Sequence, residues 1–184
     1  MSWFQAIMPK EQGLFGQFRR HIGGDANARP IRQPGETGPS TKAETCAYVQ
    51  YGALLYRERK GVEVLLVTSR ESGRWVIPKG WPMKHKSAAE AAAREAFEEA
   101  GVTCRVKDDA LGAFHYLKRL KSGDAVECEV VVFPMSVGKE HSRWPEKHER
   151  KRRWFAIADA AEAVDEQELM GIILQFGRDR SLKG

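Results

Sequence analysis

Apolar and polar residues alternate in several short runs, which is the pattern of half-buried β-strands. The clearest runs are residues 45–57 and 62–68, both rich in β-forming side chains, with Gly52 as a candidate bulge in the first. Shorter strands are predicted over residues 74–77, 103–106, 110–117 and 154–157. A further run at 125–135 contains a continuous apolar stretch, which is typical of a central strand covered on both faces.

Helical periodicity predicts three helices in the same part of the chain. The first spans residues 87–100, because Ser87 and Glu90 have capping-box spacing and Gly101 suits a left-handed C-cap. It follows a predicted loop that Pro78 opens. Two more helices are predicted over residues 158–164 and 166–176. Strands on both sides of one helix, followed by C-terminal helices, predict an α/β (α+β) fold with a mixed β-sheet flanked by helices.

The chain is expected to hold one domain with a segment at each end. Residues 1–42 combine a short helical pattern with many Pro and Gly residues, so they are predicted to form a partly ordered N-terminal extension. Residues 43–178 form the domain, and residues 179–184 form a C-terminal tail. The extension is free to pack on the core, to cover a cleft or to mediate dimer contacts, and the sequence does not choose among these roles.

Composition and charge leave the class of ligand open. The 184 residues include 30 Lys and Arg against 25 Asp and Glu, and this net charge of +5 suits an anionic ligand or simply a basic surface. The cysteines Cys46, Cys104 and Cys128 lack zinc-ligand spacing and are expected to be small buried side chains in a reducing compartment. Because neither a signal-peptide pattern nor a membrane-spanning run is found, we expect a cytoplasmic protein.

Three carboxylates share one face of the predicted helix at 87–100. Glu95, Glu98 and Glu99 lie three and four residues apart, so they fall on neighbouring positions around the helix. Like charges at these spacings repel each other, and a cation would relieve the repulsion. Oxygen ligands favour a hard cation such as Mg²⁺. Taken alone, such a motif is more often a solvated acidic helix face.

The surrounding stretch, residues 80–102, resembles the Nudix box. The matching fixed positions are Gly80, Arg94, Glu95, Glu98, Glu99, Gly101 and Val102. Two positions depart from the pattern: Lys86 replaces the first glutamate, and Ala96 replaces a bulky apolar residue. The resemblance implies a Nudix-type α/β/α sandwich over roughly residues 42–176.

The same resemblance implies a metal site and a set of catalytic residues. Glu95, Glu98 and Glu99, with the carbonyl of Gly80, would hold Mg²⁺, for which Mn²⁺ could substitute. The three carboxylates would also form the catalytic set, and Arg94 would orient them. The general base is either one of these glutamates or a residue on a later loop, where the candidates are Glu146 and Glu149, and we include Glu149 in the predicted catalytic set.

The expected substrate is a polyphosphorylated small molecule. Basic residues before the helix are predicted to bind its phosphates, because charge-assisted hydrogen bonds recognise phosphate strongly. The predicted substrate-binding residues are Arg70, Arg74, Lys79, Lys84 and Lys86. The tract at residues 75–80 resembles the branch of Nudix hydrolases that cleaves diphosphoinositol and diadenosine polyphosphates. This implies Mg²⁺-dependent cleavage of phosphoanhydride bonds, and the choice between an inositol and a nucleotide scaffold stays open.

Two alternative functions follow from other features. The basic run at residues 147–153 and the net charge would suit an RNA 5′-pyrophosphohydrolase, or simply a solvated loop. The departure at Lys86 would suit a Nudix domain that has lost catalysis and senses nucleotides. Neither a membrane nor nucleic acid is the expected partner, whereas a homodimer is compatible with the resemblance.

Overall fold

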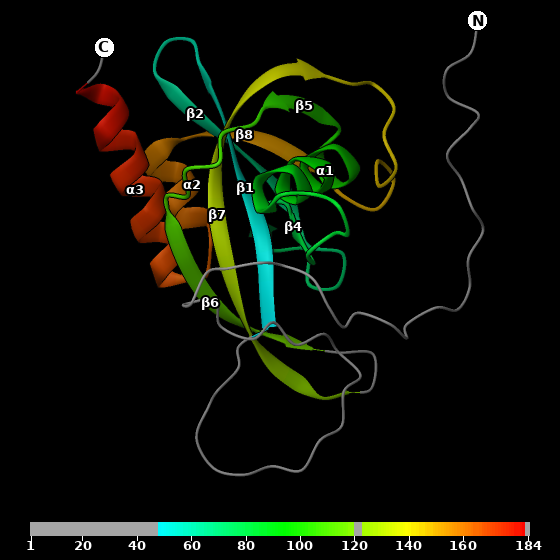
Figure 1. Cartoon of the computed structure of the whole chain (residues 1–184). Coiled ribbons are helices and arrows are strands. Elements are labelled where there is room, and N and C mark those ends of the chain that lie inside the picture. The colour runs from blue at the N-terminus through cyan, green and yellow to red at the C-terminus, as the bar shows by residue number, and fades with distance from the viewer. Residues whose placement is uncertain (1–47, 120–122, 183–184) are drawn as a thin grey trace, which may run out of the picture.

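The computed structural model describes residues 48–119 and 123–182, which form eight strands and three helices (Figure 1). In chain order they are β1 (Tyr48–Glu58), β2 (Val62–Thr68), β3 (Trp75–Val76), β4 (Lys79–Gly80), α1 (Ala88–Ala100), β5 (Val102–Arg105), β6 (Gly112–Arg119), β7 (Ala125–Glu140), β8 (Arg152–Ala156), α2 (Ile157–Ala163) and α3 (Gln167–Ser181). The predicted N-terminal extension lies outside the described residues, as does Cys46.

All eight strands belong to one mixed sheet. The strand order is β3-β2-β1-β7-β5, while β4 pairs with β1, β6 with β7 and β8 with β2. Strands β1 and β7 run parallel, and the other pairs are antiparallel. Strand β7 contacts β1, β5 and β6, so the sequence correctly predicted a central strand there, although β7 extends to Glu140.

Helices cover both faces of this sheet and enclose two hydrophobic clusters (Figure 1). Helix α1 packs on one face against Ala53, Leu55 and Val67, and its own small residues allow a close approach. Helices α2 and α3 pack on the other face against Leu54 and Leu66. Successive residues along each of β1 and β2 therefore pack into opposite clusters, as the two-residue period of a strand requires. The predicted α/β/α sandwich is confirmed.

Two local predictions are wrong. Residues 79–80 form strand β4, paired through Tyr51 with Gly80, where a loop was expected. Gly52 is not a bulge, because the pairing of β1 with β7 continues through it without a shift. A Cβ atom at Gly52 would lie 2.9 Å from the side chains of Ile77 and Val130, so close packing is what requires the glycine.

The C-terminal boundary and the cysteines add smaller corrections. Helix α3 continues to Ser181, so residues 179–181 of the segment predicted as a tail are helical. Cys128 is buried as expected, whereas Cys104 is half-buried, and both are free thiols. Among the described residues, no helix is long and apolar enough to cross a membrane.

Candidate active site

A cleft of about 670 Å³ lies beside α1, at the ends of several strands. Its charged lining is uneven in sign. The cationic side chains are Arg70, Arg74, Lys79, Lys118, Arg119 and Arg150. The acidic side chains are Glu71, Glu95, Glu99 and Glu146. The two acidic residues from α1 thus face a predominantly basic wall, which suits an anionic ligand.

Local sequence signals fix both ends of α1. The Ser87 hydroxyl accepts a hydrogen bond from the Glu90 amide at 3.2 Å, and the Glu90 carboxylate accepts one from the Ser87 amide at 2.7 Å. This is the predicted capping box. At the other end Gly101 has a φ of 64°, the predicted left-handed cap. With both ends fixed, the carboxylate face of α1 is held in register with the cleft.

Gly80 allows Glu95 to approach the backbone of β4. A Cβ atom at position 80 would overlap the Glu95 carboxylate, so any other residue would displace that side chain. The pKa of Glu95 is raised to about 7, mainly by burial and then by the neighbouring charges of Glu99 and Glu98. A bound cation would therefore stabilise the ionised form of Glu95.

Glu99 is 7% exposed and is the second carboxylate of the cleft. Arg150 donates to its Oε1 at 2.5 Å, while its Oε2 is buried and has no hydrogen-bond partner in the described part of the chain. Burial raises the pKa of Glu99 to about 7, although Arg150 and Lys79 oppose the shift. An unpartnered buried carboxylate oxygen is costly unless something binds it.

Glu98 is the third carboxylate of the predicted set on α1. It forms an ion pair with Arg94, and it does not line the cleft. The predicted contact of Arg94 with a box carboxylate is therefore present, and the carboxylate is that of Glu98. Within residues 48–119 and 123–182, no three His, Cys, Asp or Glu side chains are grouped to hold a metal ion.

The residues nevertheless fit a divalent cation. Glu95 and Glu99 supply hard oxygen donors in a buried place, and one oxygen of Glu99 has no other partner. These two residues would hold the ion, and the predicted further ligands are Glu98 and the Gly80 carbonyl.

A loop at residues 141–151 brings further groups to the cleft. Glu146 lines it and accepts a hydrogen bond from Arg150 at 2.5 Å, and its amide bonds the carbonyl of Glu98 at 3.1 Å. Glu149 is exposed and pairs with Arg70 at 3.3 Å, outside the cleft lining. Of the two candidates for a general base, Glu146 is thus the one placed beside Glu95 and Glu99.

The same loop is anchored to the C-terminal end of α1. The ring of Trp144 packs directly over Gly101, where a Cβ atom would overlap it. Arg152 stacks on that ring, with its guanidinium carbon 4.2 Å from the ring centre, and donates hydrogen bonds to the carbonyls of Ala100 and Gly101. These contacts satisfy helix-end carbonyls and hold the loop that carries Glu146.

Three of the five predicted substrate-binding residues line the cleft: Arg70, Arg74 and Lys79. Lys79 lies deepest, with its amine 5.1 Å from the ring centre of Tyr116. Burial lowers the pKa of Lys79, and the charges of Glu99 and Glu166 partly restore it. Lys84 and Lys86 are exposed and lie outside the cleft lining, so the structure does not bring these two together with Lys79.

Sequence reasoning missed three cations of the cleft: Lys118, Arg119 and Arg150. Lys118 follows Tyr116 on the same face of β6, so the strand period could have placed both beside the cleft. Arg150 stands within a basic run that we treated as a single block, although its side chain is only 8% exposed. No local pattern separates it from its neighbours.

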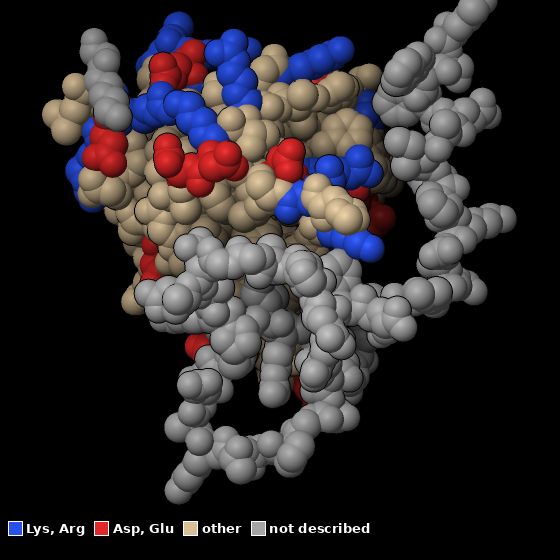
Figure 2. Space-filling view, in the orientation of Figure 1, with Lys and Arg blue, Asp and Glu red and all other residues tan. Residues whose placement is uncertain are grey.

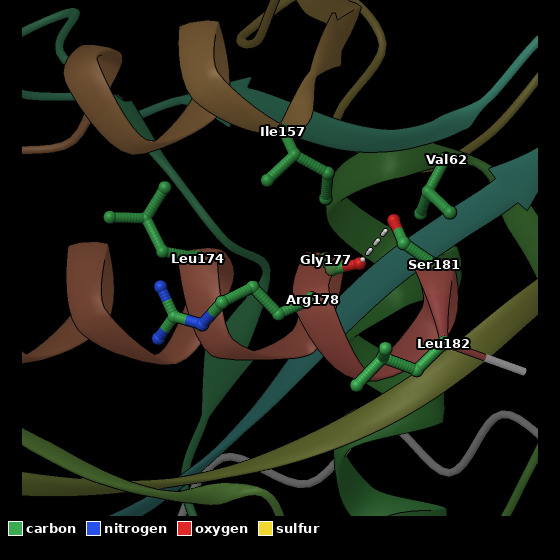
Figure 3. A pocket seen from close by; sticks show the side chains of 7 residues that line it. All are labelled: Val62, Ile157, Leu174, Gly177, Arg178, Ser181 and Leu182. Carbon is green, nitrogen blue, oxygen red and sulfur yellow. Dashed lines mark hydrogen bonds between the residues drawn. The ribbon is translucent and has the colours of Figure 1, made fainter.

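A second hollow lies far from these residues in the fold. It has a volume of about 480 Å³ and lies between β2, α2 and the end of α3 (Figure 3). Its lining is mostly apolar and includes none of the predicted site residues. The lining residues are Val62, Ile157, Leu174, Gly177, Arg178, Ser181 and Leu182. Within the described residues, the predicted site residues that line a cavity are therefore all in the first cleft.

The sandwich and the glycine-to-carboxylate motif define a Nudix-type domain. The family model for the Nudix domain matches residues 49–174, so the chain belongs to the Nudix family. Nudix hydrolase 13, mitochondrial, of Arabidopsis thaliana is 30% identical over 128 residues, which are 67% of this chain and 63% of that protein. Diphosphoinositol polyphosphate phosphohydrolase 3-alpha of Mus musculus is 33% identical over 114 residues, 60% of this chain and 65% of that protein.

A solved structure supports the fold. The binary complex of a C. elegans Ap4A hydrolase has a TM-score of 0.55 at 21% identity, covering 72% of this chain and 97% of that one. The match to each curated relative named above spans less than two thirds of that relative's length.

Proposed function

We propose that this protein hydrolyses phosphoanhydride bonds of a polyphosphorylated small molecule, with Mg²⁺ as cofactor and Mn²⁺ as a substitute. The observation that carries the proposal is the cleft itself, which Glu95 and Glu99 line together with six cationic side chains. Carboxylates that can hold a hard cation and basic groups that can hold phosphates are the two requirements of this chemistry.

Each group of the cleft has a role in this reaction. A bound divalent ion would neutralise charge on the phosphate oxygens and make a water nucleophilic. Glu95 and Glu99 would hold that ion, and Glu98, which is paired with Arg94, would be a further ligand. Lys79, Arg70 and Arg74 bind and orient the phosphates. Glu146 takes the proton from the attacking water, and its ion pair with Arg150 holds it in the cleft.

Glu149 has a supporting role in this scheme. It belongs to the predicted catalytic set, but it lies outside the cleft lining and is paired with Arg70. There it would hold Arg70 toward the phosphates.

A diphosphoinositol polyphosphate is the first substrate to test. The mouse relative carries that activity in its name, and a ring bearing many phosphates suits six cations in one cleft. A dinucleoside polyphosphate is the second candidate. The cleft lining also includes the apolar side chains of Trp81, Met83 and the 71% exposed Leu117, against which a nucleobase could pack.

An RNA end is less well supported as the substrate. The basic run at residues 147–153 does not form one basic surface, because Arg150 is buried among carboxylates and Arg152 binds the end of α1. On the face seen in Figure 2, acidic and basic side chains are interspersed. We also retain a cytoplasmic location as a proposal, motivated by the free thiols of Cys104 and Cys128.

The test is a hydrolysis screen of the purified protein with Mg²⁺ and with Mn²⁺. The panel contains diphosphoinositol polyphosphates, dinucleoside polyphosphates, nucleoside triphosphates and 5′-triphosphorylated RNA. We expect metal-dependent release of phosphate or nucleotide from the first two classes. Glu98→Gln and Glu99→Gln should each lower kcat by orders of magnitude. The control, Glu162→Gln, removes an exposed carboxylate on α2 and should leave kcat unchanged.

Two results would contradict the proposal. One is the absence of turnover on the whole panel by a protein whose circular dichroism shows it to be folded. The other is activity on RNA alone, which would favour an RNA 5′-pyrophosphohydrolase. Tight nucleotide binding without metal and without turnover would instead identify a sensing module.

A further inference from the structure

Arg150 is a buried cation that already binds the carboxylates of the cleft. Its side chain is 8% exposed and donates to Glu99 Oε1 at 2.5 Å and to Glu146 Oε2 at 2.5 Å. A third donor reaches the carbonyl of Thr68 at 2.9 Å. The backbone beside it is fixed as well, because Thr68 and Lys151 exchange two hydrogen bonds of 2.9 Å. Arg150 therefore sits where a divalent cation would also be attracted.

The charges of the cleft work against a divalent ion that arrives alone. Its lining contains six cationic side chains and four carboxylates, which is an excess of two positive charges. Glu99 and Glu146, two of those four, are each paired with Arg150. A polyphosphate reverses this balance, because each phosphate brings negative charge to the same space.

We propose that Arg150 is a resident counter-cation that makes divalent-metal binding depend on the polyphosphate. Arg150 and the ion compete for Glu99, so the ion alone binds weakly. A phosphate offers the guanidinium a bidentate partner, and Arg150 then shares its charge with the phosphate and leaves Glu99 to the ion. The two ligands consequently bind with positive coupling, and the coupling is reciprocal. This inference rests on the proposed function for the identity of its ligands.

The first test measures Mn²⁺ affinity by electron paramagnetic resonance without any phosphate compound. Arg150→Met should bind Mn²⁺ at least roughly tenfold more tightly than the unaltered protein, because a cation a few ångströms from the ion is removed. The control is Arg153→Met, which makes the same change in net charge at an exposed residue outside the cleft. It should leave the affinity within about twofold, since exposed charges at a distance are screened.

The second test measures the coupling itself with methylenebisphosphonate, which is not hydrolysed. In the unaltered protein the bisphosphonate should tighten Mn²⁺ binding by roughly tenfold or more, a typical size for coupled sites. The double variant Glu95→Gln/Glu99→Gln corrects for the complex that Mn²⁺ and the bisphosphonate form in solution. In Arg150→Met the tightening should shrink to a few-fold. Arg150→Lys keeps the charge and should resemble the unaltered protein in the first test.

Several outcomes would overturn the proposal. Weaker Mn²⁺ binding by Arg150→Met would mean that Arg150 only positions Glu99, and unchanged binding would mean that the two cations do not compete. If Arg150→Met does not fold, as judged by circular dichroism, the absence of coupling in the unaltered protein still refutes the idea. Because neither test uses turnover, an inactive protein with coupled binding would contradict the proposed function and leave this inference standing.

Discussion

At the scale of single residues, Gly80 decides whether Glu95 can reach its place in the cleft. We expect Gly80→Ala to lower kcat by roughly tenfold or more, because the new Cβ would overlap the Glu95 carboxylate and misplaced catalytic groups are costly. The free energy of unfolding should change much less than the activation free energy of the reaction. Steady-state kinetics and urea unfolding on the same preparation measure both quantities.

A matched control for Gly80→Ala exists on α3. A Cβ atom at Gly171 would meet no atom within 4 Å, so Gly171→Ala should leave kcat unchanged. It should also stabilise the protein by about 0.5–1 kcal/mol, the usual gain of alanine over glycine in a helix. Equal losses of kcat in the two variants would show that Gly80 has no special role.

Cys104 gives a prediction about pH. Its thiol lies 3.4 Å from the sulfur of Met135, and burial raises its pKa from 9.0 to about 11. The folded state thus keeps a proton that the unfolded state loses, so this group's contribution to stability is present below pH 9 and is lost as the pH rises toward 11.

The measurement is alkylation of Cys104 in a Cys46→Ser/Cys128→Ser background. At pH 8 the folded protein should react roughly tenfold or more slowly than the same protein in urea, because the thiolate is the reactive form. Its rate should rise with pH through 10 without levelling off. A plateau near pH 9 would show an unshifted thiol.

At the scale of elements, what the sequence could predict depended on how local the signal was. Helix α1 was predicted almost to the residue, because Ser87, Glu90 and Gly101 mark its ends within the chain itself. Strand β4 was missed because two residues are too few to show the alternation of a strand. Its partner, Tyr51, lies in a segment distant in the sequence. Strand β7 and helix α3 are longer than predicted, since their exposed ends are polar and are held by neighbouring elements.

The residues of the candidate site also differ in how local their sequence signals are. The spacing within the helix predicted Glu95 and Glu99 as carboxylates of one site, and both line the cleft. Lys84 and Lys86 are close to the motif in sequence, but both are exposed and neither lines the cleft. Arg150 is 51 residues from Glu99 and contacts it only because β8 pairs with β2. Such long-range pairs become visible only in the folded chain.

At the scale of the whole molecule, the two hydrophobic clusters share strands and should unfold together. Leu54 belongs to the cluster under α3, and its neighbours Ala53 and Leu55 belong to the cluster under α1. Loss of one face would expose half of every central strand. A small domain of this kind is expected to show a single cooperative transition.

Ile173→Ala tests this linkage from the face opposite the cleft. Ile173 is fully buried in the cluster under α3, so its truncation should cost about 2–5 kcal/mol of unfolding free energy. Below the transition temperature kcat should stay within about twofold, because α1 and the cleft lie across the sheet. The control is Leu182→Ala at an 86% exposed position, which should change stability by less than about 0.5 kcal/mol.

Calorimetry of Ile173→Ala should show one transition at a lower temperature, with activity lost in the same range. Two separate transitions, or a fall in kcat well below the melting range, would show that the two faces are not linked through the sheet in this way.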